Sequence, residues 1–208
     1  MKVISFLNPK GGSGKTTAVI NFATALARKG LKIAVVDTDP QMSLSNWHIE
    51  EKCNFDVFTA AGENDVYSIP EDLAEYDYTV IDGAGSLSVI TAAAVMVSDL
   101  VIIPVSPSPL DFSASGSVMA VLKAQSRNRK DPIHSRFLIT RKVEQATMLA
   151  TLKASIKDTG IPAYRTSIAQ RQSYVKCLLD GETVFDTNDT NAKGEIEVLT
   201  QEILSTFE

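Results

Sequence analysis

A glycine-rich stretch near the start of the chain, residues 8–17, constrains the fold more than any other feature. It follows a short apolar run at residues 3–7 and precedes a helical pattern that begins near Thr16. Glycines let backbone N–H groups turn toward phosphate oxygens, and the following helix adds unpaired donors and the positive end of its dipole. The order strand, glycine-rich loop, helix therefore predicts a phosphate-binding loop. A glycine-rich turn without a ligand is the alternative.

The side chains of this loop predict a nucleotide site. Lys15 follows the last glycine and is placed to reach the β- and γ-phosphates, while the Thr16 hydroxyl is placed to ligate Mg²⁺. We therefore expect ATP, its product ADP and Mg²⁺ as ligands. The expected nucleotide contacts in the loop are Lys10, Gly11, Gly12, Ser13, Gly14, Lys15, Thr16 and Thr17.

One position departs from the plain G-x-x-x-x-G-K-[ST] pattern, because Pro9 stands where the first glycine belongs and Lys10 follows it. The sequence K-G-G-S-G-K-T-T at 10–17 resembles the deviant Walker A loop of the ParA/MinD group of ATPases. Lys15 and the backbone already serve the phosphates of one subunit. The resemblance implies that Lys10 is catalytic across a homodimer with two sandwiched ATP molecules, where a cation in trans contributes about 10³-fold or more. A solvated lysine is the alternative.

The chain as a whole predicts one α/β domain, residues 1–208, without an N-terminal DNA-binding extension. Apolar residues make up 44% of 208 residues, and short apolar runs alternate with helical patterns. This alternation predicts a mainly parallel, twisted sheet of about seven strands with helices on both faces. Strands are expected at 2–7, 31–37, 55–60, 78–82, 100–105, 134–140 and 162–167. Helices are expected at 16–29, 43–49, 70–76, 88–97, 112–127, 145–158, 174–179 and 193–206.

Two carboxylates, Asp37 and Asp39, end the second expected strand and lie beside the phosphate loop. The sequence D-T-D-P-Q at 37–41 is similar to the switch I motif of ParA-type ATPases. That resemblance implies that Asp39 positions and polarises the attacking water. We interpret Asp37 as support for the loop or for the outer shell of the metal. The alternative for both is that they cap the helix that begins near Ser43.

Asp82 ends the apolar strand expected at 78–82. One aspartate delivered by such a strand is the Walker B arrangement, in which the carboxylate holds Mg²⁺ directly or through a water. The expected metal residues are therefore Thr16, Asp82 and Asp37. Because Asp82 and Gly83 also form an ordinary turn sequence, this prediction depends on the two motifs that precede it.

The prolines at Pro104, Pro107 and Pro109 stiffen the loop after the fifth expected strand. With the motifs above and the chain length, they resemble the short plasmid-partition branch of the ParA family, of the ParF type. This resemblance covers essentially all 208 residues and is more specific before residue 100 than after it. It implies that the proline-rich segment lies near the nucleotide base and the dimer interface. A plain strand terminator is the alternative.

The net charge of −5 is unevenly distributed. Between Lys123 and Lys176 there are twelve basic residues and three acids, a net charge of +9, which suggests a face that meets a polyanion. Chance clustering on a solvated surface is the alternative. No helix-turn-helix or base-stacking pattern is present, so we expect non-specific DNA binding. The candidates are Arg127, Arg129, Lys142, Arg171 and Lys176. Arg141 follows the sixth expected strand at the ligand edge and is expected to serve the adenine, with DNA contact as the alternative.

Two other function classes compete with DNA segregation. A MinD-like membrane-cycling ATPase calls for a basic amphipathic helix, but the amphipathic pattern at 195–208 is charged only by glutamates. A cluster-binding ATPase would want paired cysteines, and Cys53 and Cys177 lack metal-ligand spacing. A small-molecule synthetase of the same fold stays open. No signal segment or membrane span is expected, so the predicted location is cytoplasmic.

The resemblance implies a partition cycle. ATP would drive dimerisation or polymerisation and DNA binding on the nucleoid. A ParB/ParG-like adaptor that binds a centromere would stimulate hydrolysis and so drive the segregation of a plasmid or other DNA. The partner is implied by the resemblance alone.

Overall fold

The computed structural model describes residues 1–48, 54–127, 133–143 and 146–208. The candidate DNA residue Arg129, the cysteine Cys53 and the predicted helix ends at Ile49 and Gln145 lie outside these residues. Cys177, the other cysteine, is a free and buried thiol.

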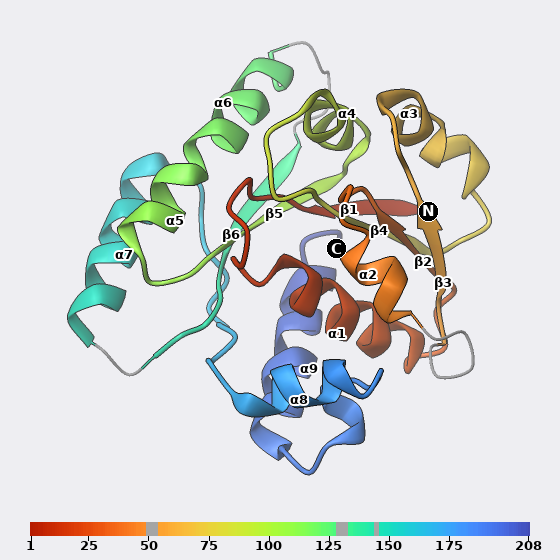
Figure 1. The fold of residues 1–208 in the computed structure, drawn as a ribbon. Helices are drawn as coiled ribbons and strands as arrows, with labels where there is room; N and C mark the ends of the chain where they lie inside the picture. The colour runs from red at the N-terminus through yellow and green to blue at the C-terminus, as the bar shows by residue number, and fades with distance from the viewer. Residues whose placement is uncertain (49–53, 128–132, 144–145) are drawn as a thin grey trace.

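A parallel six-stranded sheet forms the centre of the described structure (Figure 1). Its strands pair in the order β3-β2-β4-β1-β5-β6, so that the first strand is internal and flanked by the fourth and fifth. All five pairings are parallel, which requires a crossover connection between neighbours. The strands are β1 (Lys2–Phe6), β2 (Ile33–Asp37), β3 (Asp56–Thr59), β4 (Tyr78–Asp82), β5 (Leu100–Val105) and β6 (His134–Ile139).

Helices cover both faces of this sheet (Figure 1). The helices α1, α8 and α9 pack on one face, and α3, α4, α6 and α7 pack on the other. Among the described residues, none of the helices has the length and apolar character needed to cross a membrane. Their bounds are α1 (Lys15–Ala27), α2 (Ser43–Trp47), α3 (Glu63–Asp72), α4 (Val89–Val97), α5 (Pro109–Ala114), α6 (Gly116–Gln125), α7 (Ala146–Thr159), α8 (Gln172–Leu179), the 3₁₀ turn η1 (Val184–Asp186) and α9 (Thr190–Leu204).

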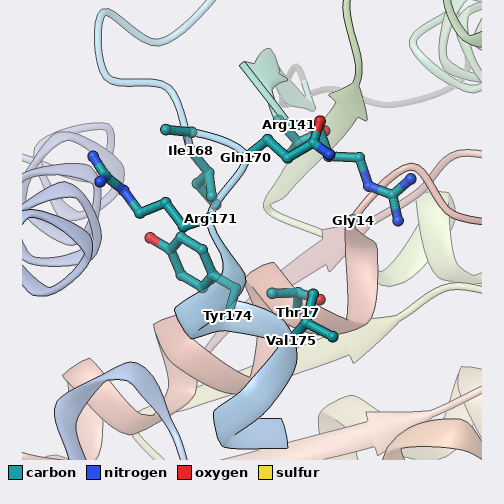
Figure 2. A pocket seen from close by; sticks show the side chains of 10 residues that line it. Gly14, Thr17, Arg141, Ile168, Gln170, Arg171, Tyr174 and Val175 are labelled. Carbon is teal, nitrogen blue, oxygen red and sulfur yellow. The ribbon is translucent and has the colours of Figure 1, made fainter. Parts of the chain in front are cut away.

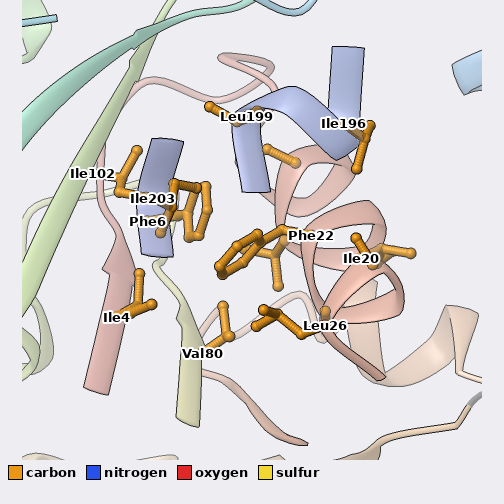
Figure 3. Close-up of a cluster of buried hydrophobic side chains, with 14 of the residues drawn as sticks. Ile4, Phe6, Ile20, Phe22, Leu26, Val80, Ile102, Ile196, Leu199 and Ile203 are labelled. Atoms are coloured by element: carbon orange, nitrogen blue, oxygen red, sulfur yellow. The ribbon is translucent and has the colours of Figure 1, made fainter. Parts of the chain in front are cut away.

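The helix that follows the glycine-rich loop is anchored in the core. Phe22 of α1 is fully buried and lies against Phe6 of β1 with 5.8 Å between ring centroids. Figure 3 shows Leu26, Val80 and Ile203 around the same ring. Because α1, two strands and α9 meet at this point, the N-terminus of α1 is held in a fixed position at the edge of the sheet.

The predicted seventh strand at 162–167 does not form, so the expected strand count was too high by one. Ala163 makes one isolated bridge to Phe137 of β6. The N–H groups of Arg165 and of the next residue then donate to Glu202 Oε2 of α9, at 3.0 and 3.3 Å. After Tyr164, the next donor toward β6 in a parallel ladder would be the Thr166 N–H, and because that group donates to Glu202 instead, the ladder stops after one bridge.

Two predicted helices differ in extent from the observed ones. The helix expected to begin at Pro70 spans Glu63–Asp72, because the Asp65 carboxylate accepts the N–H groups of the two residues before Glu63 and closes the N-terminus earlier. The helix expected at 112–127 is divided into α5 and α6. The Ser115 hydroxyl donates to the Phe112 carbonyl at 2.6 Å between them.

Candidate nucleotide-binding site

The glycine-rich loop joins β1 to α1 at the carboxyl edge of the sheet. Gly12 and Gly14 have φ values of +76° and +84°, which side chains rarely adopt, and Gly14 is the N-cap of α1. The Lys15 side chain is buried, and its Nζ donates to the Lys10 carbonyl at 3.3 Å. Burial lowers the pKa of Lys15, and the carboxylates of Asp82 and Asp39 oppose that shift. The loop therefore surrounds a desolvated amine that has two acids nearby.

Asp82 lies where a P-loop magnesium ion would be held. The parallel register aligns it with Phe6 of β1 and Asp37 of β2. The Thr16 hydroxyl donates to Asp82 Oδ2 at 2.7 Å, while Asp82 Oδ1 is buried without a hydrogen-bond partner. Burial raises the pKa of Asp82 to about 7. An unpartnered carboxylate oxygen beside a hydroxyl fits a hard divalent cation, which prefers oxygen ligands.

The two acids at the end of β2 have different surroundings. Asp37 is buried, and its oxygens accept the N–H of Asp39 and both the N–H and hydroxyl of Ser45, at 2.9 to 3.0 Å. Asp37 therefore joins the loop after β2 to the first turn of α2, which is the contact that the helix-capping alternative predicts. Asp39 is partly exposed, and its Oδ2 accepts the Gly85 N–H at 3.2 Å. Gly85 in turn lies against Gly11, so Asp39 faces the glycine-rich loop.

The described residues contain no group of three or more His, Cys, Asp or Glu side chains that would hold a metal ion unaided. Such a group is not required here, because a P-loop Mg²⁺ takes much of its coordination from phosphate oxygens and water. Thr16 and Asp82 are the two predicted metal residues that the structure brings into contact. Asp37 lies opposite Asp82 in the register, but its hydrogen bonds are directed to the protein backbone and Ser45.

A cavity of about 230 Å³ opens on the far side of the loop (Figure 2). Arg141 has a φ of +48°, and its guanidinium lies 3.6 Å from the position of a Cβ added to Gly12. The base of α1 meets the end of β6 and the start of α8 here. The cavity lining includes Gly14, Thr17, Thr140, Arg141, Ala169, Gln170, Arg171 and Tyr174.

Two residues of this edge were not among the predicted site residues. Asn8 is 1% exposed, donates to the Pro104 carbonyl at 2.7 Å and accepts the Lys10 N–H at 2.9 Å. Thr140 is also buried, and its hydroxyl donates to the Ser13 carbonyl at 2.7 Å. The carbonyls of Pro104 and Ser13 that these side chains bind lie 96 and 127 residues away along the chain, so no local pattern signals these two bonds.

The described DNA candidates fall into two groups. Lys142 and Arg171 lie at neighbouring positions, since residues 142 and 168–170 exchange backbone hydrogen bonds, and the exposed Lys176 follows on α8. The Arg171 guanidinium is paired with Glu195 at 2.7 Å and lies 3.9 Å from Asp189. Arg127 is exposed just beyond the far end of α6, at the amino edge of the sheet, away from the others.

A parallel α/β sheet with a glycine-rich loop after its first strand, and with carboxylates from two neighbouring strands beside that loop, defines a P-loop nucleotide-binding protein. Comparison with known families makes the class more specific. The chain belongs to the CobQ/CobB/MinD/ParA nucleotide binding domain family, which matches residues 4–184. The ParA/MinD resemblance predicted from residues 10–17 and 37–41 is thereby confirmed.

Curated relatives match most of the chain. The maintenance of carboxysome distribution protein A of Halothiobacillus neapolitanus is 26% identical over 208 residues, covering 97% of this chain and 95% of the relative. The protein of the same name from Gloeobacter kilaueensis is 30% identical over 199 residues, with 92% and 88% covered. Protein ParA of Rhizobium radiobacter is 25% identical over 180 residues, with 84% and 81% covered.

Solved structures show the same fold at low identity. Apo McdA from Cyanothece superposes with a TM-score of 0.82 at 18% identity, covering 98% of this chain and 99% of that one. An ATP complex of a McdA variant from Cyanothece gives 0.80 at 16% identity, with 99% and 96% covered. The cobyrinic acid a,c-diamide synthase of Mycobacterium smegmatis, with ADP and magnesium bound, gives 0.77 at 18%, with 100% and 95% covered.

Proposed function

We propose that this chain is a Mg²⁺-dependent ATPase of the ParA/MinD type that distributes a cargo over DNA. The observation that carries this proposal is the convergence of Lys15, the Thr16–Asp82 pair and Asp39 beside one glycine-rich loop. A cationic cradle, metal ligands and a carboxylate for the attacking water are the parts that phosphoryl transfer requires.

Each part has a role in this proposal. The loop N–H groups and Lys15 bind the β- and γ-phosphates, and Thr16 with Asp82 holds Mg²⁺. When bound, that ion neutralises charge on the phosphate oxygens. Asp39 accepts a hydrogen bond from the attacking water and orients it toward the γ-phosphate. The Gly85 N–H, which donates to Asp39 Oδ2, sets the direction of the carboxylate.

The cavity beside Gly14 and Thr17 is our proposed site for the adenine. It opens directly from the loop, and its volume of about 230 Å³ is bounded by Arg141 on one side and Tyr174 on the other. The Gln170 side chain lies next to Arg141 (Figure 2) and offers an amide to the base edge. In this proposal, Arg141 contacts the adenine.

The same sheet edge supports association of two copies. Lys10 is exposed at the loop entrance, where it is free to approach the nucleotide of a partner subunit. Large apolar side chains are also exposed on the loops around it, and exposed apolar surface of this kind marks interaction sites. We propose an ATP-sandwich homodimer, with higher polymers as its extension. The exposed apolar residues on these loops and the helix starts beside them are Met42, Leu87, Val89 and Leu110.

We propose that the ATP-bound form of the chain binds to DNA. Lys142 and Lys176 are exposed near the nucleotide cavity, so their position is linked to the nucleotide site. The apolar residues of α9, such as Ile196 and Ile203, are buried in the core, which supports DNA rather than lipid as the partner surface. We propose a centromere-binding or cargo-bound adaptor as the activator of hydrolysis. The name of one relative gives a carboxysome-like body as a candidate cargo, and the resemblance described from the sequence gives a plasmid as another.

One experiment tests the proposal. The purified chain is incubated with ATP or ADP and Mg²⁺, and its binding to random duplex DNA and to anionic liposomes is measured alongside phosphate release. We expect ATP-dependent binding to DNA and slow hydrolysis, both lost in Lys15→Ala. Recruitment to liposomes instead of DNA would favour the MinD-like cycle. Unchanged ATP affinity in Lys15→Ala would contradict the P-loop assignment itself.

A further inference from the structure

Asn8 stands where β1 stops pairing with β5. The Leu7 N–H donates to the Ile102 carbonyl at 2.9 Å, the last backbone bond of that pairing toward the loop. Because donors in a parallel ladder repeat every second residue on each strand, the next two bonds would run from residue 104 to the Leu7 carbonyl and from residue 9 to the Pro104 carbonyl. The first is excluded because Pro104 has no N–H. Residue 9 is Pro9, which has no N–H to donate. The ladder therefore lacks a donor at the point where the phosphate loop begins.

The Asn8 side chain supplies the missing bond. Its Nδ2 donates to the Pro104 carbonyl at 2.7 Å, and its Oδ1 accepts the Lys10 N–H at 2.9 Å. The side chain is 1% exposed, so water does not compete for these partners. One buried amide thus joins the end of β5 to the entrance of the loop, and both of its polar atoms are satisfied.

We propose that Asn8 is a positioning residue that fixes the direction of Lys10. The Lys10 peptide is held on its N–H side by Asn8, and its carbonyl accepts the Lys15 Nζ at 3.3 Å. The Lys10 peptide is therefore held on one side by the sheet, through Asn8, and on the other by the Lys15 side chain of α1. This inference rests on the proposed function, in which both lysines act on phosphate. It also accounts for Pro9, which removes the backbone donor that would otherwise extend the strand past the loop entrance.

The test is a double-mutant cycle on the full chain. Asn8→Ala should lower kcat for ATP hydrolysis by about tenfold or more, because a misplacement of about 1 Å is enough to reduce a rate on that scale. The ATP dissociation constant, measured separately, should change less than about threefold, because the loop N–H groups that bind phosphate are retained. In a Lys10→Ala background, Asn8→Ala should cause little further loss, since the two residues act as one unit.

Thr140→Val is the matched control. It removes another buried tether of the same loop, the 2.7 Å bond to the Ser13 carbonyl, on the side away from Lys10. The fold-decrease in kcat of the Thr140→Val/Lys10→Ala double variant should therefore equal the product of the two single decreases. Multiplying effects of Asn8→Ala and Lys10→Ala would overturn the positioning role.

A second variant separates positioning from folding. In Asn8→Ala/Pro9→Ala, the new N–H at residue 9 is able to donate to the Pro104 carbonyl and to restore the ladder. We expect the midpoint of thermal unfolding to recover from its value in Asn8→Ala while kcat stays low, because the Lys10 N–H still has no acceptor. Recovery of kcat together with stability would overturn the inference. If Asn8→Ala does not fold, this double variant takes its place in the cycle.

The outcomes also separate this inference from the proposed function. A wild-type chain that hydrolyses no ATP would overturn both. A Lys10→Ala variant as fast as wild type would overturn the positioning role and the catalytic role of Lys10, but not the ATPase assignment. A slow Lys10→Ala variant beside an Asn8→Ala variant of wild-type rate would overturn the positioning role alone.

Discussion

Asp39 and Asp37 lie two residues apart, yet their carboxylates have different surroundings and contacts in the structure. Asp39 is partly exposed and faces Gly11, and its two oxygens accept the N–H groups of Gln41 and Gly85. Asp37 is buried and binds away from the glycine-rich loop, to the Asp39 N–H and to Ser45. We predict that Asp39→Ala keeps ATP affinity but slows hydrolysis by about 10²-fold or more, the range for a group that orients or deprotonates water. Nucleotide titration and single-turnover phosphate release measure the two quantities. Wild-type turnover in this variant would refute the water-positioning role.

The buried Asp82 predicts a pH dependence of stability in the nucleotide-free chain. Burial, with smaller effects of Asp37 and Asp39, raises the pKa of Asp82 from 3.8 to about 7. The folded state therefore binds the extra proton between these values, so the contribution of Asp82 to stability falls as the pH rises toward about 7. A shift of one pKa unit corresponds to about 1.4 kcal/mol, so the total loss is a few kcal/mol at most.

Asp82→Asn removes this charge and should be more stable than wild type at about pH 8, with an advantage that shrinks as the pH falls toward about 4. Denaturant unfolding of both proteins across this range, without nucleotide, gives the difference directly. The same variant should lose Mg²⁺-dependent ATP binding, since a carboxylate ligand is gone. A stability difference that does not change with pH would contradict the raised pKa.

At the scale of single residues, the sequence was most informative where the site is contiguous. The residues at 10–17 share one loop, so their spacing alone predicts a phosphate cradle. Asp82 was predicted because an apolar strand precedes it. Asn8 and Thr140 were not, because a hydrogen bond to a carbonyl about a hundred residues away leaves no local pattern. The different contacts of Asp37 and Asp39 likewise depend on Ser45 and Gly85. These two residues are brought next to the carboxylates by the fold and are not predicted by the sequence around residues 37–39.

At the scale of elements, strand prediction succeeded for all six strands observed in the described residues, including the mostly exposed edge strand β3, and failed at 162–167 beside β6. The strands from β1 to β6 are apolar segments between helices, and that alternation is visible in the sequence. The run at 162–167 is much less apolar, and the Thr166 N–H, which would continue the pairing with β6, donates to Glu202, 36 positions away. Competition for backbone donors between a strand and a distant carboxylate has no signature in local periodicity.

Glu202 is therefore expected to fasten the segment after Ala163 to α9. Its carboxylate accepts the N–H of Arg165 and both the N–H and the hydroxyl of Thr166. Glu202→Ala should reduce the free energy of unfolding by about 1 to 2 kcal/mol, since partly buried donors lose their acceptor. Glu197→Ala, on an exposed position of the same helix, is the control and should change it by less than about 0.5 kcal/mol. Equal effects of the two variants would contradict the assignment.

At the scale of the whole molecule, the described basic residues between 123 and 176 are distributed over separate parts of the surface. The basic segment from 123 to 176 is not one patch, because Arg127 lies at the amino edge while Lys142 and Lys176 lie near the nucleotide cavity. Arg171, between those two lysines, is already paired with Glu195. Charge counted along the sequence therefore overstates the surface available to a polyanion. Lys142 and Lys176 lie near the cavity, so in our proposal their availability for DNA depends on which nucleotide is bound.

The position of these lysines near the cavity predicts how DNA binding should respond to mutation and to salt concentration. Each phosphate contact contributes about −0.9 to the slope of log affinity against log salt concentration. Lys176→Ala should weaken ATP-dependent binding to random duplex DNA and reduce the magnitude of that slope by about one. Lys29→Ala removes the same charge from an exposed position just past the end of α1, at the opposite edge of the sheet. It should leave both quantities nearly unchanged, whereas equal losses in the two variants would indicate a response to net charge and would contradict a DNA surface beside the nucleotide cavity.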